Sequence, residues 1–137
     1  MILVDSSAWV EFDRATGSTV DQRLAALIAG GNANTPDAVG VTEPVLMEVL
    51  AGARDAKRHD DLRRLLTSFE WVPSDAVTDF EAGARIYRSC RAAGLTPRRL
   101  VDCMIAGIAI RSGARLLAAD QDFEQMATVV PLQLDIV

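Results

Sequence analysis

The sequence is poor in the residues that bind zinc or form disulfides. Among 137 residues there are two cysteines, Cys90 and Cys103, and one histidine, His59. The cysteines do not form a C-x-x-C pair, and a single histidine cannot complete a zinc site. We therefore expect reduced thiols and a cytoplasmic location. His59 has no neighbouring nucleophile and lies in a polar stretch, so we expect it on the surface.

Long apolar runs are also missing. The opening run, residues 1–4, is too short for a signal peptide, and no basic residues precede it. No stretch of about 18 uncharged apolar residues is present, so we expect no membrane-spanning helix. Repeats and low-complexity segments are absent as well. At this length we expect residues 1–137 to form a single domain.

Basic residues are fewer than acidic ones. Lysine and arginine together number 14 against 19 aspartates and glutamates, which gives a formal net charge of -5. This balance argues against a broad nucleic-acid-binding surface, but it permits a local basic patch or a metal ion that offsets clustered acids. Half of the residues are hydrophobic, enough for one sizeable core.

Short apolar runs alternate along the chain with segments of helical periodicity. We predict strands at residues 1–4, 38–41, 71–73, 116–119 and 129–134. We predict helices at residues 6–16, 18–30, 42–51, 55–69, 74–93 and 96–111, and a short helical turn after residue 120. Buried strands alternating with helices predict an α/β fold with a parallel sheet covered on both faces.

Several acids stand in surroundings that are otherwise apolar. Asp5 ends the strand Ile-Leu-Val, and Glu48 interrupts the apolar helix sequence VLMEVL. Asp102 precedes an apolar helix, and Asp120 ends the predicted strand at residues 116–119, with Asp122 two residues further on. These acids differ from the rest, which sit among polar neighbours as solvated surface.

The placement of these acids predicts a shared site. The carboxyl ends of parallel strands line the ligand crevice of an α/β sheet, which is where Asp5 and Asp120 belong. Glu48 lies in a mostly buried helix, with no lysine or arginine within one helical turn. A buried carboxylate is costly unless it is paired or bound to a metal. We therefore expect the acids to converge on a cation, and oxygen ligands suit Mg²⁺ or Mn²⁺.

Each acid also has an ordinary structural explanation. Asp5 could cap the helix that follows it, although Ser6 and Ser7 offer hydroxyls for that role. Asp102 could favour the first turn of its helix through the helix dipole. Asp120 and Asp122 could form a turn, and Glu48 could be exposed at the edge of its helix.

Three blocks of sequence together resemble a known family. They are MILVDSSAWV, PVLMEVLAGAR and RRLVDCMIAGIAIRSGARLLAADQDFEQMA. In this order, and over essentially the whole chain, they resemble PIN-domain ribonucleases, specifically the VapC-type toxins of bacterial type II toxin–antitoxin systems. The resemblance implies a PIN-like α/β/α sandwich in which a short central parallel sheet is flanked by helices.

The resemblance also assigns roles to the acids. It implies that Asp5 and Asp102 are direct metal ligands, and that Glu48 and Asp120 complete the acidic pocket, partly through water. Asp122 competes with Asp120 for the fourth position. We favour Asp120 because it directly follows the predicted strand, whereas Asp122 could cap the next helix.

The implied chemistry is hydrolysis of RNA by metal-activated water. Mg²⁺ or Mn²⁺ lowers the pKa of a bound water and neutralises charge on the phosphate, and a nearby carboxylate accepts the proton. The products are a 5′-phosphate and a 3′-hydroxyl. Four carboxylates could hold one ion or two. On the family pattern Ser7, more than Ser6, is the hydroxyl that supports the site.

RNA and protein partners are implied as well. Arg98 and Arg99 lie one turn before Asp102 and could contact phosphates. Arginines 85, 88 and 91 share one helix and could extend that track or simply be solvated. The resemblance implies an RNA substrate such as tRNA and a homodimer. It also implies a VapB-like antitoxin that covers the acidic pocket, for which we expect an apolar groove around Trp9 and residues 46–50.

Three other functions are considered. An aspartyl phosphatase requires a second aspartate two residues after the first, where this chain has Ser7. A receiver domain requires a lysine in the pocket, whereas the single lysine, Lys57, lies in a polar helix. A catalytically silent PIN-like binding module would have lost one of the acids, and none is lost.

Overall fold

The centre of the fold is a short parallel sheet. The protein was analysed as a computed structural model, which describes residues 1–31 and 33–136. Its strands are β1 (Ile2–Val4), β2 (Val39–Val41), β3 (Glu70–Trp71) and β4 (Arg115–Leu117). They pair in parallel in the order β3-β2-β1-β4, so their carboxyl ends meet at one edge of the sheet.

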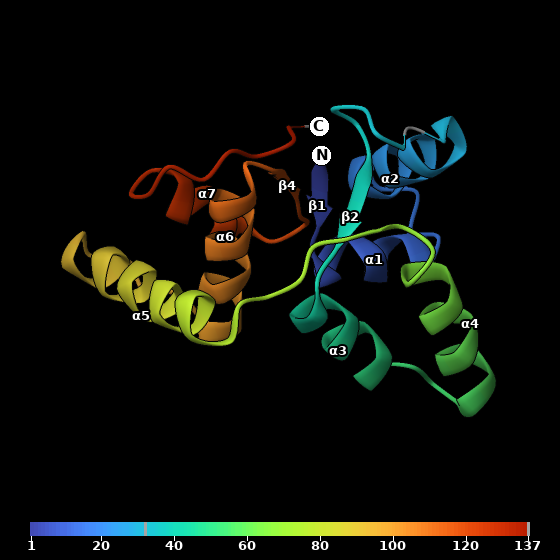
Figure 1. The fold of residues 1–137 in the computed structure, drawn as a ribbon, viewed down its shortest axis with the longest axis horizontal. Coiled ribbons are helices and arrows are strands. Elements are labelled where there is room, and N and C mark those ends of the chain that lie inside the picture. The colour runs from blue at the N-terminus through green and yellow to red at the C-terminus, as the bar shows by residue number, and fades with distance from the viewer. Residues whose placement is uncertain (32, 137) are drawn as a thin grey trace.

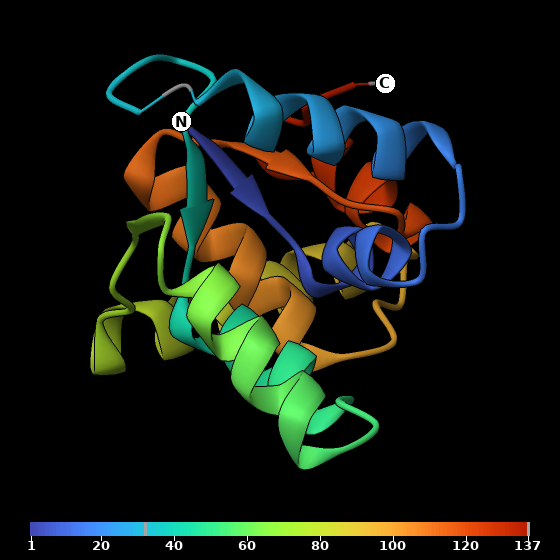
Figure 2. The same cartoon turned by 90° about the vertical axis from the view of Figure 1, so that its right-hand side faces the viewer.

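Helices cover both faces of this sheet. The described residues form α1 (Ser6–Asp13), α2 (Thr19–Gly30), α3 (Glu43–Ala51), α4 (Ala56–Leu66), α5 (Ala76–Ala92), α6 (Leu100–Ser112) and α7 (Gln121–Ala127). Figures 1 and 2 show α1 and α2 on one face and α6, with α5 packed outside it, on the other. The predicted α/β/α arrangement is therefore confirmed.

Helix α6 forms much of the core because its sequence is apolar all round. Residues 102–109 of α6 are buried between the sheet and α5. Two glycines bring α5 and α6 close together. A Cβ on Gly83 would lie 3.2 Å from the backbone nitrogen of Met104, and one on Gly107 would lie 3.1 Å from the Cβ of Ala82. This close packing fixes the position of α6, and with it the position of Asp102 in its first turn.

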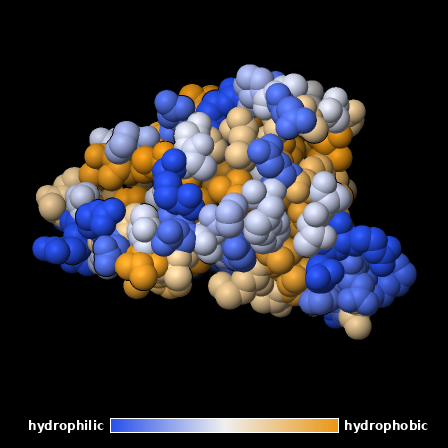
Figure 3. Space-filling view, in the orientation of Figure 1, coloured by the Kyte–Doolittle hydropathy of each residue, from blue (hydrophilic) through white to orange (hydrophobic). Residues whose placement is uncertain are grey.

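The surface differs sharply between helices. The outer side of α4 is hydrophilic, because its basic and acidic residues interleave, whereas orange side chains are exposed over α5 (Figure 3). Trp9 is buried against Phe12 and Phe69, with ring centroids 6.1 and 5.7 Å away.

Cys90 and Cys103 are free and buried, and burial raises the pKa of Cys103 to about 11. No helix in residues 1–31 and 33–136 has both the length and the hydrophobicity needed to cross a bilayer.

Two predicted boundaries near the acids were wrong. Helix α6 begins at Leu100, not at residue 96, because the backbone of Arg99 is extended (φ -136°, ψ 133°) and the backbone N–H of Arg98 donates to Oδ2 of Asp122. Strand β4 ends at Leu117, not at residue 119, because the backbone N–H of Ala119 donates to the hydroxyl of Ser7.

The strand predicted at residues 129–134 was also wrong. Only a single bridge forms there, between Leu134 and Leu116 of β4. Pro131 has no backbone N–H to donate to a ladder, and residues 129 and 130 still bond to the last turn of α7. The rest of this segment therefore lies against the edge of the sheet without joining it.

Candidate metal centre

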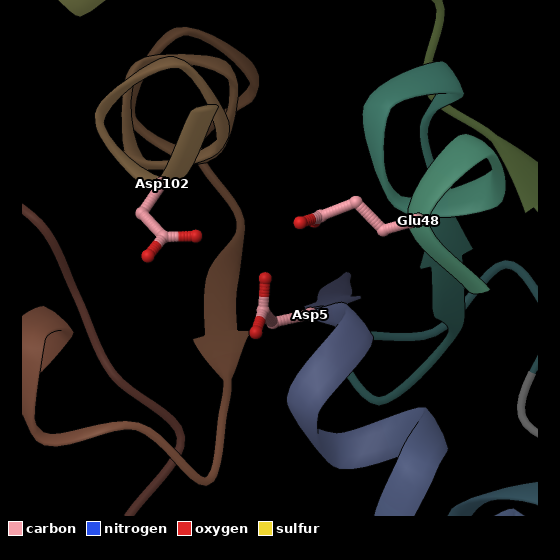
Figure 4. A group of neighbouring side chains, drawn as sticks. All are labelled: Asp5, Glu48 and Asp102. Atoms are coloured by element: carbon pink, nitrogen blue, oxygen red, sulfur yellow. The ribbon is translucent and has the colours of Figure 1, made fainter. Parts of the chain in front are cut away.

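Three acids from three separate elements meet at the carboxyl edge of the sheet. Asp5 directly follows β1, Glu48 lies in α3, and Asp102 lies in the first turn of α6. Carboxylate oxygens of the three lie within 4.8 Å of one another. Figure 4 shows the three side chains pointing toward a common space. Helix α3 begins at this edge after β2, and α6 begins there before it returns to β4, so the parallel sheet brings both helices to the end of β1.

A second group of acids adjoins the first. Carboxylate oxygens of Asp102, Asp120 and Asp122 also lie within 4.8 Å of one another, so Asp102 belongs to both groups. Asp120 precedes α7 and Asp122 lies in its first turn. The structure therefore brings all five of the acids singled out in the sequence into one region, which we call the acidic centre.

Asp5 has the least satisfied side chain of the acidic centre. Its Oδ2 accepts hydrogen bonds from the backbone N–H of Ser7 at 3.0 Å and from the Ser7 hydroxyl at 2.6 Å. Its Oδ1 is buried and has no hydrogen-bond partner among the described residues. A buried acceptor without a partner is costly, and a metal ion would satisfy it. The oxygen-only donor set of this centre fits Mg²⁺ or Mn²⁺.

Both serines after Asp5 contact the acidic centre. The hydroxyl of Ser7 donates to Asp5 and accepts from the backbone N–H of Ala119 at 2.9 Å, so it ties β1 to the segment after β4. The hydroxyl of Ser6 donates to Oε1 of Glu48 at 3.0 Å. Asp5 itself caps α1, which confirms that alternative for the cap and not the serine hydroxyls.

Burial makes two carboxylates of the acidic centre, Asp5 and Asp102, harder to ionise. The pKa of Asp102 is raised to about 6, mainly by burial and also by the charge of Asp5, against the opposing effect of Arg99. Burial also raises the pKa of Asp5, although the hydrogen bonds from Ser7 act in the other direction. Each of these carboxylates would be stabilised in its charged form by an added cation.

Two arginines already contact the acidic centre. The side chain of Arg98 donates to Asp120 at 2.7 Å and to Asp122 at 3.2 Å. Arg99 donates to both oxygens of Asp102 and to Glu48, each at 3.3 Å. No lysine or arginine lies within one helical turn of Glu48, as the sequence indicated, but Arg99 reaches Glu48 from the start of α6.

The structural reason for favouring Asp120 over Asp122 was wrong. Asp120 does not follow β4 directly, and it is Asp120, not Asp122, that caps α7 by accepting from the backbone N–H of Asp122 at 2.9 Å. Asp122 is buried, and hydrogen bonds from the backbone and then the side chain of Arg98 lower its pKa. Both aspartates line the acidic centre, so the choice between them stays open.

An open cavity lies beside the acidic centre. Its volume is about 570 Å³, and its lining combines the two serines, one carboxylate of the centre and two arginines with smaller side chains: Ser6, Ser7, Val10, Glu11, Arg14, Glu48, Ala51, Arg99 and Ala119. Cavities of several hundred Å³ accommodate small organic ligands. A nucleotide unit could therefore enter next to Glu48.

The apolar groove lies elsewhere than expected. Trp9 is only 1% exposed, so it cannot line a groove, and the expectation around it was wrong. A cavity of about 600 Å³ instead lies between α3, α5 and α6. Met47, Phe80 and Leu100 line it and are each more than 60% exposed. Of the residues expected to form the groove, Trp9 does not line it, whereas Met47 from residues 46–50 does.

Comparison with known proteins gives matches over nearly the whole chain. The family model described as "PIN domain" matches residues 2–129. Ribonuclease VapC11 of Mycobacterium tuberculosis is 43% identical over 133 residues, which are 97% of this chain and 96% of that protein.

Solved structures share the fold at lower identity. VapBC2 from Rickettsia felis, bound to a DNA fragment from its promoter, has a TM-score of 0.74 at 16% identity and is covered over 98% of both chains. VapC20 of Mycobacterium tuberculosis, a sarcin-ricin loop cleaving toxin, has a TM-score of 0.68 at 21% identity, with 97% of this chain and 99% of that chain covered. At these identities the likeness demonstrates the fold alone.

Proposed function

This chain belongs to the PIN-domain family, in its VapC ribonuclease branch, and we propose that it is a metal-dependent endoribonuclease, the toxin of a toxin–antitoxin pair. One observation carries the proposal. Three carboxylates from distant parts of the sequence lie within 4.8 Å of one another, and one buried oxygen among them, Oδ1 of Asp5, has no partner among the described residues.

The proposed roles follow from position in the acidic centre. Asp5 and Asp102 are the deepest carboxylates and would ligate the ion directly. Ser7 holds Asp5 in orientation through its 2.6 Å hydrogen bond. Glu48 is the most accessible of the three and borders the open cavity. We therefore propose that Glu48 accepts the proton of the attacking water. Asp120 and Asp122 complete the centre through Asp102.

The proposed ion is Mg²⁺ or Mn²⁺. Bound at the acidic centre, it would activate water for attack on a phosphodiester and neutralise charge on the phosphate. Arg99 and Arg14 flank the adjoining cavity and are the cations closest to where a phosphate would enter. We propose that this activity is cytoplasmic, since the proposed substrate is RNA.

We propose a VapB-like antitoxin as the natural inhibitor. Structures similar in fold include VapBC2 from Rickettsia felis and a VapBC complex from Salmonella typhimurium bound to DNA. An inhibitor with a basic segment would complement a chain of net charge -5 whose acidic centre opens to a cavity. The identity of the RNA, with tRNA as the family-level candidate, is part of the same proposal.

We propose that a second copy of the chain covers the apolar groove between α3, α5 and α6. Glu43 is the one charged residue among those that line it, so two copies could approach there without strong repulsion. Phe80→Asp should convert the dimer to a monomer in sedimentation velocity, with unchanged secondary structure by circular dichroism. A wild-type chain that sediments as a monomer at micromolar concentration would contradict this.

Cleavage of RNA in the presence of metal tests the proposed function. Purified chain should cut total RNA or tRNA with Mg²⁺ or Mn²⁺ and leave 5′-phosphate ends, and EDTA should stop the reaction. Asp102→Ala should remove cleavage. Asp60→Ala, a change at an exposed aspartate outside the acidic centre, should not. Mapping of transcripts cut after brief expression would identify the substrate.

The alternative function is a catalytically silent PIN-like binding module. It requires that the wild-type chain, loaded with Mn²⁺, leave total RNA and transcripts in cells intact. RNA cleavage by the wild type in EDTA, together with cleavage by Asp5→Ala, would contradict the proposed site as well. Cleavage that needs the metal and Asp5 excludes the silent module.

A further inference from the structure

The two neighbouring arginines at the acidic centre are held very differently. Arg98 makes three hydrogen bonds: its backbone N–H to Asp122 at 3.0 Å, its Nε to the same oxygen at 3.2 Å, and its Nη2 to Asp120 at 2.7 Å. Asp122 therefore holds both the main chain and the side chain of Arg98. Its carboxylate partners belong to the outer group of acids.

Arg99 is held only by its side chain, and loosely. Its guanidinium reaches Oδ1 and Oδ2 of Asp102 and Oε2 of Glu48, and all three distances are 3.3 Å. Charge-assisted hydrogen bonds of good geometry are shorter, about 2.7–2.9 Å. Exposure does not separate the two arginines, since the side chain of Arg98 is more exposed than that of Arg99. Arg99 therefore bridges α6 and α3 across the mouth of the centre without being locked there.

The contacts of Arg99 leave the deepest oxygen unsatisfied. It neutralises part of the charge of Asp102 and Glu48, but Oδ1 of Asp5 stays without a partner among the described residues. A divalent ion bound to oxygens of all three acids would satisfy that atom. It would also share with the guanidinium the oxygens that Arg99 now contacts, at a separation where like charges repel strongly.

We propose that Arg99 is a displaceable internal cation: it closes the metal-free centre, leaves Asp102 and Glu48 when a divalent ion binds, and then turns toward the phosphate of the substrate. The inference rests on the proposed function. Competition for the same oxygens supports it, since Arg99 and the ion would both bind the carboxylates of Asp102 and Glu48. Arg99 also lines the open cavity beside Glu48, which gives its displaced side chain a place to go.

The test is the affinity for Mn²⁺ alone, measured by titration calorimetry on the full chain without RNA. Arg99→Gln should bind Mn²⁺ about tenfold more tightly than the wild type, because the competing cation is gone. Arg98→Gln is the comparison variant: it removes the same charge one residue away and frees Asp120 and Asp122, but it leaves the contacts of Arg99 with Asp102 and Glu48 in place. We expect it to tighten binding by at most about threefold in 0.15 M salt. Arg99→Lys should fall between wild type and Arg99→Gln.

A second readout separates competition from simple misfolding. Added Mn²⁺ should raise the melting temperature of Arg99→Gln by more than that of the wild type, because its metal-free centre carries more uncompensated charge. At saturating Mn²⁺, Arg99→Gln should cleave RNA more slowly in kcat, since it lacks the guanidinium that turns toward the phosphate. An affinity gain no larger than that of Arg98→Gln, or a loss of affinity, would overturn the proposal.

Failure of the proposed function gives a different result. In that case wild-type chain with bound Mn²⁺ leaves RNA intact, and the affinity order of the variants is still measurable and still decides the role of Arg99 in metal binding. Asp5→Asn, which removes the deepest ligand, should weaken Mn²⁺ binding in either case.

Discussion

Two buried aspartates in this protein have opposite surroundings. Asp79 in α5 has both carboxylate oxygens paired with Arg111 at 2.8 Å and accepts a further hydrogen bond from the backbone of Asp75. Asp5 is equally buried, but one of its oxygens has no partner among the described residues.

The pKa values of the two aspartates follow the same contrast. Burial acts to raise the pKa of Asp79, but the hydrogen bonds from Arg111 and the Asp75 backbone outweigh it and the pKa is lowered. At Asp5 burial dominates and the pKa is raised. A buried acid that is fully paired supports the fold, whereas one that is left unpaired marks a site that awaits a cation.

The largest expected effect is on catalysis. Asp5→Asn should lower RNA cleavage by roughly a thousandfold or more, since it removes a direct metal ligand. The same change should leave the metal-free protein at least as stable as the wild type near pH 7, because an amide is not ionised in this buried position. Gel-based cleavage and urea unfolding with EDTA measure the two effects. A variant that loses stability along with activity would place Asp5 with Asp79 as a structural residue.

The matching change at the other aspartate should do the reverse. Asp79→Asn leaves Arg111 without its charged partner and should reduce the free energy of unfolding by about 3 kcal/mol. Cleavage per folded molecule should not change, because Asp79 lies in α5, outside the acidic centre. Urea unfolding at pH 7 gives the stability, and cleavage at low temperature gives the activity. Loss of cleavage at full stability would contradict the distinction.

The pH dependence of stability should differ in sign at the two places. Because the folded pKa of Asp102 is raised from 3.8 to about 6, the folded state binds more protons than the unfolded state in this range. Its contribution to stability therefore decreases as the pH rises from about 4 to about 6. Asp79, whose folded pKa is lowered, contributes stability that is present above pH 3.8 and is lost only as the pH falls through its folded pKa.

The difference in the free energy of unfolding between wild type and Asp102→Asn isolates the pH-dependent contribution of Asp102. With EDTA, Asp102→Asn should gain roughly 1–3 kcal/mol relative to wild type between pH 4 and pH 7. Urea unfolding of both chains at pH 4, 5, 6 and 7 measures it, and saturating Mn²⁺ should raise wild-type stability at the upper end. A difference that is constant with pH would show that Asp102 does not titrate in this range.

The smallest expected effect concerns the support of Asp5. Ser7→Ala removes a hydrogen bond to Asp5 and one from Ala119, so we expect about 1 kcal/mol less stability and about tenfold slower cleavage. Ser6→Ala removes only the hydrogen bond from Ser6 to Glu48, so it should slow cleavage by less. Cleavage rates at saturating Mn²⁺ compare the two. An equal or larger effect at Ser6 would reverse the preference for Ser7.

Predictions of fold and site from the sequence succeeded where the signal was local. The apolar run at β1 predicted a buried parallel strand, and the isolated acids in apolar segments predicted that Asp5, Glu48 and Asp102 converge. Predictions failed where contacts at long range accompany a boundary, as where the side chain of Asp122 holds the backbone of Arg98 ahead of α6. Asp79 was missed because its neighbours, such as Val77 and Phe80, are exposed and no apolar run marks its burial, which only the packing of α5 against α6 produces.

The order of strands and helices, and the cost of leaving acids in apolar segments, were determined by the sequence alone, because periodicity and burial act over a few residues. The tertiary structure decided which arginine forms an ion pair with which carboxylate. Arg111 reaches Asp79 and Arg99 reaches Glu48 across 32 and 51 positions of sequence. Such pairing depends on the distance between folded elements, and coulombic energy follows that distance, not the separation along the chain.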